Sequence, residues 1–191
     1  MAKRVMGVGA HPDDLEWYAG ATIGKLARAG AEITFVVCTD GEKGSFDPDA
    51  DARQIAIQRQ AEQRDAANAL GVREVIFLAR PDGELVASEE LRRQLTALYR
   101  KYQPELLLAF DPWTRYELHP DHIAAGRAAL AAQHRALALH RSQTAVWDDA
   151  ARAFIDKNAR ENGRHVGVEY AEAFRRIVIE GALIVAEGTR S

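Results

Sequence analysis

Short apolar runs alternate with amphipathic segments along most of the chain. The apolar runs are rich in Val, Ile, Leu and Phe, which is typical of buried strands. They predict strands at Arg4–Gly9, Glu32–Cys38, Glu74–Leu78 and Leu106–Phe110. Apolar residues at helical spacing predict helices at Ala19–Ala29, at Ala52–Leu70, from a cap at Ser88 to about Tyr102, and at Ala124–Ala132. This order of strands and helices predicts an α/β fold, a Rossmann-like, doubly wound and mostly parallel sheet flanked by helices.

Loops and turns separate these elements. The segment Thr39–Asp51 is rich in Gly, Asp, Ser and Pro and is expected to be a loop, and Pro81-Asp82-Gly83 is a turn signal. Past Ile123 the pattern is harder to interpret: Thr144–Ala159 favours a helix, and Arg176–Val185 fits a strand or a buried helix. No low-complexity linker interrupts the sequence, so we expect a single domain over residues 1–191.

Composition and charge narrow the class of protein. The 191 residues, 47 % of them hydrophobic, suffice for a globular domain, and a net charge of −3 gives no basic footprint for nucleic acid. The single cysteine, Cys38, excludes a disulfide within the chain. No run approaches the roughly 18 apolar residues of a membrane span, and the first residues lead directly into a strand without a signal-peptide pattern. We therefore expect a soluble cytoplasmic protein.

Two similar tetrapeptides carry the candidate chemistry. His11-Pro12-Asp13-Asp14 follows the first predicted strand, and His119-Pro120-Asp121-His122 follows the fourth. Ligands of open α/β sheets collect at the carboxyl ends of the strands, so both motifs fall where a site is expected. In each motif the outer residues are three apart, and in a helical turn such residues share one face. Imidazole and carboxylate groups are also the ligands of catalytic zinc.

Two imidazole nitrogens and one carboxylate oxygen would leave zinc a free position for water. Asp13, beside Asp14, is then a candidate general base, and the remaining imidazole is a candidate proton donor or oxyanion-stabilising group. The alternative is structural, because Pro and Asp are common in the first turn of helices. For one tetrapeptide alone we would favour helix capping. Two such motifs, each after a predicted strand, favour a metal site.

The two motifs resemble those of the zinc-dependent N-acetylglucosaminyl deacetylase family, also called LmbE-like or PIG-L-like. The resemblance rests on Ala10–Asp14 and His119–His122, and it extends to Arg59-Gln60-Ala61-Glu62, Leu70-Gly71-Val72 and Pro81-Asp82-Gly83. The chain departs from the pattern at Leu15, where many members have glutamate, and Glu16 follows instead.

The resemblance implies a role for each matched residue. It implies His11, Asp14 and His122 as ligands of Zn²⁺, a residue set that also accepts Fe²⁺ or another divalent ion. It implies Asp13 as general base and His119 as the group that stabilises or protonates the tetrahedral intermediate.

Further residues are expected around these groups. We expect Asp121 to orient His119 by accepting a ring N–H. Arg59 matches the family's sugar-binding arginine, with Arg64 on the same helix as an alternative, and Asp82 of the shared turn is a further substrate-binding candidate. Tyr116 lies three residues before His119 and is a candidate substrate contact, with surface packing an equal alternative.

The sequence therefore predicts a zinc-dependent hydrolase that removes an N-acyl group, expected to be acetyl, from an amino sugar or its conjugate. One alternative is an amidase acting on a thiol conjugate or another non-sugar amide at the same site. Another is a noncatalytic module that binds a metal or a sugar, against which the intact Asp13 and His119 argue. The resemblance also implies a homo-oligomer. A nucleotide-binding α/β protein would need a glycine-rich fingerprint that the sequence lacks.

Overall fold

A computed structural model describes residues 2–114 and 117–137. Residues 1–112 and 117–137 form one compact unit, and all of the fold described below belongs to it. The second unit, residues 113–116 and 138–191, falls outside the described residues except for Trp113 and Thr114. The elements predicted at Thr144–Ala159 and Arg176–Val185 lie there, as does Tyr116, and the expectation of a single domain stays a prediction.

Within the described residues, a parallel four-stranded sheet has the strand order β3-β2-β1-β4. The strands are β1 (Arg4–Gly9), β2 (Glu32–Thr39), β3 (Glu74–Arg80) and β4 (Leu106–Ala109). In the register of the sheet, Val5 of β1 lies opposite Ile33 on one side and Leu106 on the other. The chain moves outward from β1 through β2 to β3 and then crosses to β4, so the strand order reverses between β1 and β4. The α/β, doubly wound prediction is confirmed.

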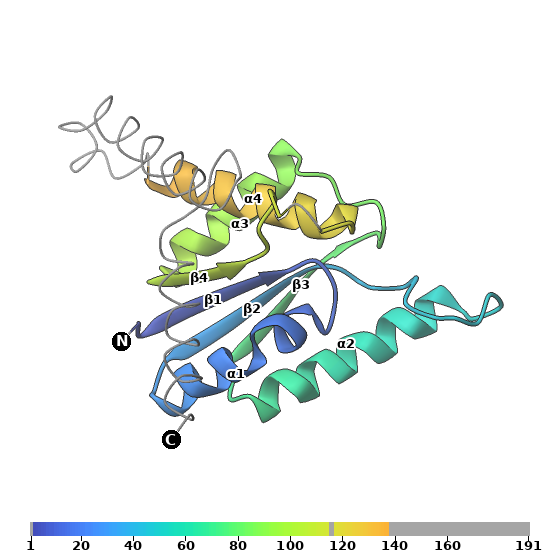
Figure 1. The fold of residues 1–191 in the computed structure, drawn as a ribbon, viewed down its shortest axis with the longest axis horizontal. Helices are drawn as coiled ribbons and strands as arrows, with labels where there is room; N and C mark the ends of the chain where they lie inside the picture. Colours follow the sequence, from blue (N-terminus) through green and yellow to red (C-terminus); the bar gives the residue numbers. More distant parts are fainter. Residues whose placement is uncertain (1, 115–116, 138–191) are drawn as a thin grey trace, which may run out of the picture. The chain divides into compact units, whose positions relative to one another are not determined.

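Helices cover both faces of this sheet (Figure 1). They are α1 (Asp14–Arg28), α2 (Ala52–Ala69), α3 (Glu89–Tyr102) and α4 (Pro120–Leu137). Side chains at their amino termini cap two of them: the Ser88 hydroxyl accepts a hydrogen bond from the Leu91 amide, and Asp51 accepts from the amides of Arg53 and Gln54. The predicted cap at Ser88 is therefore confirmed.

Two helices begin earlier than the apolar pattern indicates. Helix α1 starts at Asp14 rather than Ala19, and α4 starts at Pro120 rather than Ala124. Both starts were predicted too late because the prediction used the spacing of apolar residues, and the first turns of these helices consist largely of polar motif residues. Physically the starts are favourable, since proline fits the first helical turn and Asp14 and Asp121 complement the positive end of the helix dipole. Each motif therefore bridges a strand end and the first turn of a helix.

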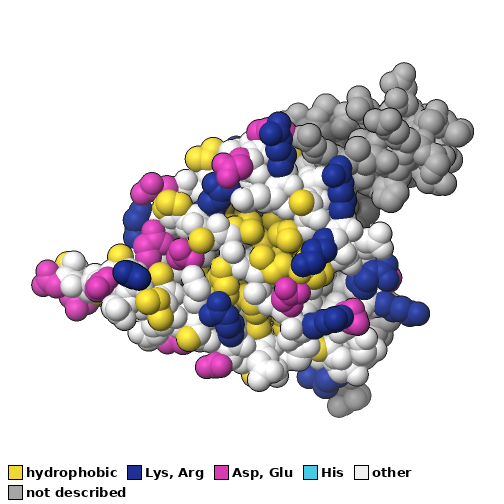
Figure 2. Space-filling view, turned by 180° about the vertical axis from the view of Figure 1, so that it is seen from behind, with side chains coloured by type: hydrophobic (Ala, Val, Ile, Leu, Met, Phe, Trp, Pro, Cys, Tyr) yellow, Lys and Arg dark blue, Asp and Glu magenta, His cyan; other side chains and the backbone are white. Residues whose placement is uncertain are grey.

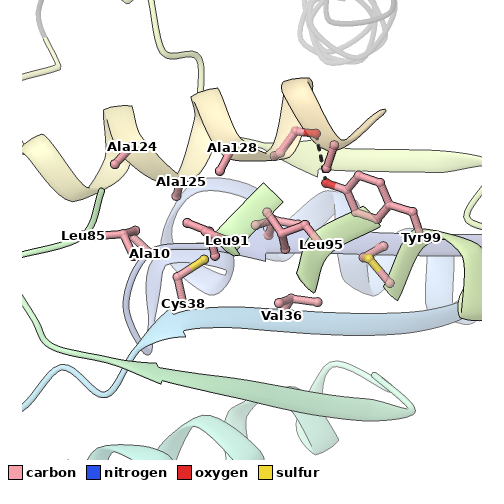
Figure 3. Close-up of a cluster of buried hydrophobic side chains, with 14 residues drawn as sticks. Ala10, Val36, Cys38, Leu85, Leu91, Leu95, Tyr99, Ala124, Ala125 and Ala128 are labelled. Carbon is pink, nitrogen blue, oxygen red and sulfur yellow. Dashed lines mark hydrogen bonds between the residues drawn. The ribbon is translucent and has the colours of Figure 1, made fainter. Parts of the chain in front are cut away.

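Between the sheet and helices α3 and α4 lies a core of large and small side chains (Figure 3). Leu91, Leu95 and Tyr99 of α3 pack beside a row of alanines on α4, and the Tyr99 hydroxyl donates a hydrogen bond of 3.3 Å to the Ala129 carbonyl. Gly126 of α4 makes the closest approach, because a Cβ added there would lie 2.5 Å from the Phe110 carbonyl oxygen. Small residues thus let α4 lie close to the end of β4. A second core, which includes Ile23, Ile33 and Phe35, packs between the other face and α1 and α2.

Charged side chains of both signs surround a central group of hydrophobic side chains on the face shown in Figure 2, and no histidine is visible there. Among the described residues, no helix is both long and apolar enough to cross a membrane.

Candidate metal centre

The two histidine motifs meet at the point where the strand order reverses. The first follows β1 and the second follows β4, and these strands are parallel neighbours with Val8 opposite Ala109. A crevice forms outside the carboxyl ends of strands at such a reversal, because the connections leave in opposite directions. The sheet topology thus explains why residues more than one hundred positions apart lie in one site.

The first motif is a tight turn built around the Asp14 carboxylate. Its Oδ2 accepts hydrogen bonds from the backbone amides of Ala10 (2.8 Å) and His11 (2.7 Å). Asp13 has a φ of +89°, a left-handed conformation that costs a non-glycine residue on the order of 1–3 kcal/mol. The Asp13 amide donates to the buried side chain of Gln63 at 2.8 Å, which helps to hold this conformation.

The three side chains implied as metal ligands converge. His11 Nδ1 lies 3.6 Å from Asp14 Oδ2, and His122 Nε2 lies 3.2 Å from Asp14 Oδ1. All three residues are buried. Two donor atoms bound to zinc at ~2.1 Å and at the tetrahedral angle lie about 3.4 Å apart. Each separation therefore fits a pair of zinc ligands, although the two pairs use different oxygens of Asp14. The donor set, two imidazoles and a carboxylate, fits as well.

Two groups of donor atoms in the described residues lie close enough to share a cation, and neither contains Asp14. In each, one atom per residue lies within 4.8 Å of the others: His11, His119 and His122 form one group, and His11, Asp82 and Asp121 form the other. His11 belongs to both groups and to the implied ligand set. It is therefore the residue around which the whole centre is organised.

The Asp121 carboxylate contacts His11 and not His119, contrary to the sequence prediction. Its Oδ2 lies 3.1 Å from His11 Nε2 and accepts from the Gly83 amide at 2.7 Å, while Oδ1 accepts from the Leu85 amide. Asp121 is completely buried, one residue inside α4, so its side chain reaches the loop after β3. The Asp121 backbone amide, rather than its side chain, contacts His119.

This amide contact defines the proton positions on His119. The Asp121 N–H donates to His119 Nδ1 at 3.2 Å, so Nδ1 carries the lone pair and the neutral ring has its proton on Nε2. Nε2 makes no hydrogen bond to any residue in the described ranges, and His119 is more exposed than His11 or His122. Its ring lies 4.5 Å from that of His11 and 4.7 Å from that of His122, measured between centroids. His119 is thus a hydrogen-bond donor at the edge of the centre.

Glu117 and aromatic rings hold His122. Glu117 Oε2 lies 3.1 Å from His122 Nδ1, although the angles are not those of a hydrogen bond. The Phe110 ring stacks on the His122 ring at 4.1 Å and 6°, and the exposed Tyr18 ring packs edge-on against Phe110. These contacts fix the orientation of the His122 ring.

Arg59 is bound to the backbone around the first motif. Its guanidinium donates to the carbonyls of Pro12 (2.7 Å) and Gly41 (3.0 Å) and to Asp13 Oδ2 (3.2 Å). A Cβ added at Gly41 or Gly44 would meet the guanidinium, so a side chain at either position requires Arg59 to shift, and Gly41 also has a φ of +64°. The Asp13 side chain itself is 76 % exposed, and among described residues its Oδ1 has no partner.

Charge within the centre shifts the protonation of its members. Burial alone would raise the pKa of Asp14, but the His11 backbone amide and the nearby imidazoles of His11 and His122 outweigh burial and hold this pKa below its usual range. Burial opposes a rise in the pKa of His11 and of His122, yet contacts with Asp14 raise both. The surroundings therefore favour positive charge at these imidazoles, from a proton or from a metal cation.

The family follows from comparison with known proteins. A family model described as PIG-L, GlcNAc-PI de-N-acetylase, matches residues 6–133, which include both motifs. The chain belongs to the PIG-L family. The recognition drawn from the two motifs is confirmed.

Relatives of this PIG-L chain include sugar deacetylases. It is 36 % identical to a diacetylchitobiose deacetylase of Thermococcus kodakarensis over 124 residues, 65 % of this chain and 46 % of the relative. It is 30 % identical to a 1D-myo-inositol 2-acetamido-2-deoxy-alpha-D-glucopyranoside deacetylase of Thermomonospora curvata, over 78 % of this chain and 58 % of the relative. The chain spans about half the length of these curated relatives.

Solved structures give the same fold with more than one chemistry. The N,N'-diacetylchitobiose deacetylase from Pyrococcus horikoshii is similar with a TM-score of 0.67 and 29 % identity, covering 88 % of this chain and 81 % of that one. A 4-carboxy-2-hydroxymuconate hydratase from Pseudomonas putida is similar with a TM-score of 0.63 and 28 % identity, covering 69 % and 56 %. Membership of the PIG-L family therefore leaves the bond that is broken or formed to be argued from the site.

Sequence reasoning gave no role to three polar residues of this PIG-L centre, although it had noted the position of Glu16. Gln63 bonds the Asp13 amide and the Glu16 carboxylate, Glu117 lies beside His122, and Glu16 itself has one buried oxygen without a hydrogen-bond partner. Glu117 carried a usable signal, since it is a carboxylate two residues before a motif histidine. Gln63 carried none, because it lies on a helix far from either motif in sequence.

Proposed function

We propose that this chain is a metal-dependent hydrolase that removes an N-acyl group, normally acetyl, from an amino sugar or its conjugate. The observation that carries the proposal is the close approach of His11 and His122 to Asp14, beside Asp13, which is suited to proton transfer, and His119, which is suited to hydrogen-bond donation. The sugar deacetylases among its relatives support the substrate class. Zn²⁺ is the proposed ion, with Fe²⁺ or another divalent cation able to use the same donors.

Asp13 takes the proton of the attacking water. When bound by His11, Asp14 and His122, a zinc ion supplies Lewis acidity, polarising the acyl carbonyl and lowering the pKa of water. The Asp13 carboxylate has one oxygen held by Arg59 and the other open, which suits a positioned base. The hydrogen bond from the Asp13 amide to Gln63 holds the left-handed backbone of Asp13, and this fixes the direction in which the Asp13 side chain leaves the backbone.

His119 stabilises the tetrahedral intermediate. Its Nδ1 accepts a hydrogen bond from the Asp121 amide, so its proton is on Nε2, the nitrogen without a partner among the described residues. As water adds to the acyl carbon, Nε2–H donates a hydrogen bond to the developing oxyanion. The proton that Asp13 took from the water then passes to the departing nitrogen as the C–N bond breaks, and the products are a free amine and a carboxylate.

Arg59 and Asp82 are the proposed substrate contacts. Arg59 already donates to Pro12, Gly41 and Asp13, and the Asp82 carboxylate faces His11 and the Lys43 amide. Both residues therefore shape the site walls through the chain itself. A sugar hydroxyl could reach Arg59 through the donor atoms that these contacts leave.

Hydration of a carbon–carbon double bond is a second candidate, because a hydratase shares the fold at 28 % identity. Such a reaction would use the same cation and base but no leaving amine. The sugar deacetylases among the relatives favour the hydrolase, and the Nε2–H of His119 suits the oxyanion of its tetrahedral intermediate.

The deciding experiment measures zinc content and acetate release together. The zinc-loaded protein is incubated with N,N'-diacetylchitobiose and N-acetylglucosamine conjugates, as wild type, Asp13→Asn and the control Asp65→Asn on the exposed face of α2. We expect about one zinc per chain. Asp13→Asn should lose roughly 10²–10⁴-fold in kcat while keeping zinc, and Asp65→Asn should match wild type.

Other outcomes identify the alternatives. Zinc binding without acetate, but with hydration of a 4-carboxy-2-hydroxymuconate, would support the hydratase. Amide cleavage confined to non-sugar or thiol conjugates would keep the mechanism and change the substrate. Zinc binding with no turnover of any compound would identify a noncatalytic binding module, and absence of stoichiometric metal would refute the metal centre.

A further inference from the structure

Two carboxylates lie beside one ring nitrogen of His11. Its Nε2 lies 3.0 Å from Asp82 Oδ1 and 3.1 Å from Asp121 Oδ2. Only the Asp121 contact has the angles of a hydrogen bond, and the Asp82 carboxylate lies beside the same nitrogen as a charged neighbour. On the other side of the ring, Nδ1 lies 3.6 Å from Asp14 Oδ2, which is too long for a hydrogen bond and close to the separation of two ligands of one zinc ion. The two nitrogens of His11 therefore have different surroundings.

We propose that Asp82 is a positioning residue which, with Asp121, keeps the proton of His11 on Nε2, so that Nδ1 is the nitrogen that binds the metal. The inference rests on the metal dependence of the proposed function, but not on the bond that is cleaved. Ligand histidines commonly donate their second N–H to a carboxylate, which fixes the ring and raises its basicity. Here the buried Asp121 carboxylate is the acceptor, and the buried Asp82 carboxylate adds a second negative charge beside the same N–H.

Glu42 and Lys43, in the loop after β2, hold Asp82 in place through three hydrogen bonds. Its amide donates to the Glu42 carboxylate at 2.9 Å, and its carbonyl accepts from the Lys43 ammonium. Its second carboxylate oxygen, Oδ2, accepts from the Lys43 amide at 3.2 Å, which leaves Oδ1 facing His11. The side chain is 10 % exposed, so water competes little for that oxygen.

The turn that carries Asp82 also holds Asp121. Gly83 adopts a φ of +75°, which turns the chain so that the amides of Gly83 and Leu85 both donate to the Asp121 carboxylate. A single loop, residues 81–85, thus orients both carboxylates toward Nε2. Because this loop contacts neither Asp14 nor His122 through any hydrogen bond or ion pair among the described residues, its effect on the metal passes through His11.

A competing arrangement would place the cation on Nε2, with Asp82 and Asp121 as ligands, since those three donors also lie within 4.8 Å of one another. Both Asp121 oxygens already accept backbone N–H groups, as does Asp82 Oδ2. Asp121 therefore serves as hydrogen-bond acceptor and Asp82 as neighbouring negative charge for the His11 N–H, and the nitrogen that binds the cation distinguishes the two arrangements.

The test combines zinc affinity with the state of the His11 ring. Zinc affinity is measured on the full chain by competition with a chromophoric chelator, for wild type, Asp82→Asn and Glu84→Gln. Asn keeps the shape of Asp82 but replaces one carboxylate oxygen with an NH₂ group. In either orientation of the amide, this NH₂ group faces another N–H, that of the Lys43 backbone or that of the His11 ring. We expect zinc to bind about tenfold more weakly to Asp82→Asn. Glu84 lies in the same loop and is 66 % exposed, so Glu84→Gln should bind zinc as wild type does.

The ring is observed by ¹⁵N NMR of the histidines in the zinc-loaded wild type. The expected spectrum shows His11 with a protonated Nε2 and a metal-bound Nδ1. A metal-bound Nε2, or an unchanged zinc affinity in a folded Asp82→Asn, would overturn the proposal. The NMR result needs no variant, so it decides even when Asp82→Asn fails to fold. A wild type with the expected ring but no acetate release would reject the proposed substrate and leave this inference standing.

Discussion

The contact between Gly126 and the end of β4 predicts opposite effects for two glycine-to-alanine changes. In an ordinary helix position, Gly→Ala stabilises a protein by roughly 0.5–1 kcal/mol. At Gly126, however, the new Cβ would lie 2.5 Å from the Phe110 carbonyl oxygen, 3.1 Å from its carbon and 3.2 Å from Pro112 Cδ. Ordinary contacts between such atoms are ~3.5 Å or longer, so α4 must move away from Phe110 by about 1 Å.

That movement would reach the metal centre. His122 lies one helical turn before Gly126 in α4, and its ring stacks on Phe110 at 4.1 Å. A shift of about 1 Å is large compared with the ~0.2 Å tolerance of metal–ligand distances. We expect Gly126→Ala to lower the free energy of unfolding by about 1–3 kcal/mol, the usual cost of overpacking, and to weaken zinc binding as well.

Gly20→Ala is the matched control. Gly20 lies inside α1, and a Cβ added there has no atom within 4 Å. Its free energy of unfolding should rise by roughly 0.5–1 kcal/mol. Urea denaturation of both variants and wild type, followed by zinc competition, measures these effects. A Gly126→Ala protein as stable as Gly20→Ala would refute the close packing of α4 on β4.

Two further predictions concern the buried thiol and the metal. Burial raises the pKa of Cys38 to about 12, so at pH 8 only about one thiol in ten thousand is ionised. We therefore expect a disulfide reagent to label Cys38 only after denaturation. Rapid labelling of the native protein would contradict the burial of this thiol. Zinc at one hundred times its Kd should stabilise the protein by about 2.7 kcal/mol, so chelation should lower Tm by roughly 5–10 °C. The same chelator should not change the Tm of a folded Asp14→Asn variant, and an equal drop there would show that its effect is not removal of metal from this centre.

The positions of the strands could be predicted from the sequence because each strand is a short apolar run bounded by turn or loop residues. It was less informative where function and structure share residues. The starts of α1 at Asp14 and of α4 at Pro120 were concealed because their first turns consist of motif residues, which carry no apolar spacing. The capping interpretation that we weighed against metal binding therefore also describes a real property, since each motif does begin a helix.

The motifs identified the centre but not its internal contacts. The approach of His11, Asp14 and His122 follows from two neighbouring parallel strands, which sequence can predict. The partner of Asp121 depends on where the loop after β3 folds back, and no periodicity encodes that. The left-handed conformation of Asp13 cannot be predicted from the sequence either, because it depends on contacts of the turn with Gln63 and Arg59 of another helix.

The wide sequence separation of the centre has a consequence for how the protein folds. His11 and Asp121 are 110 positions apart, Asp13 and Gln63 are 50 apart, and Asp121 and Leu85 are 36 apart. Contacts that close such long loops form late, after local helices and neighbouring strands. We therefore expect the centre to be unformed in the folding transition state. A metal bound there would slow unfolding and leave the folding rate unchanged, so it would lengthen the lifetime of the native chain without guiding its assembly.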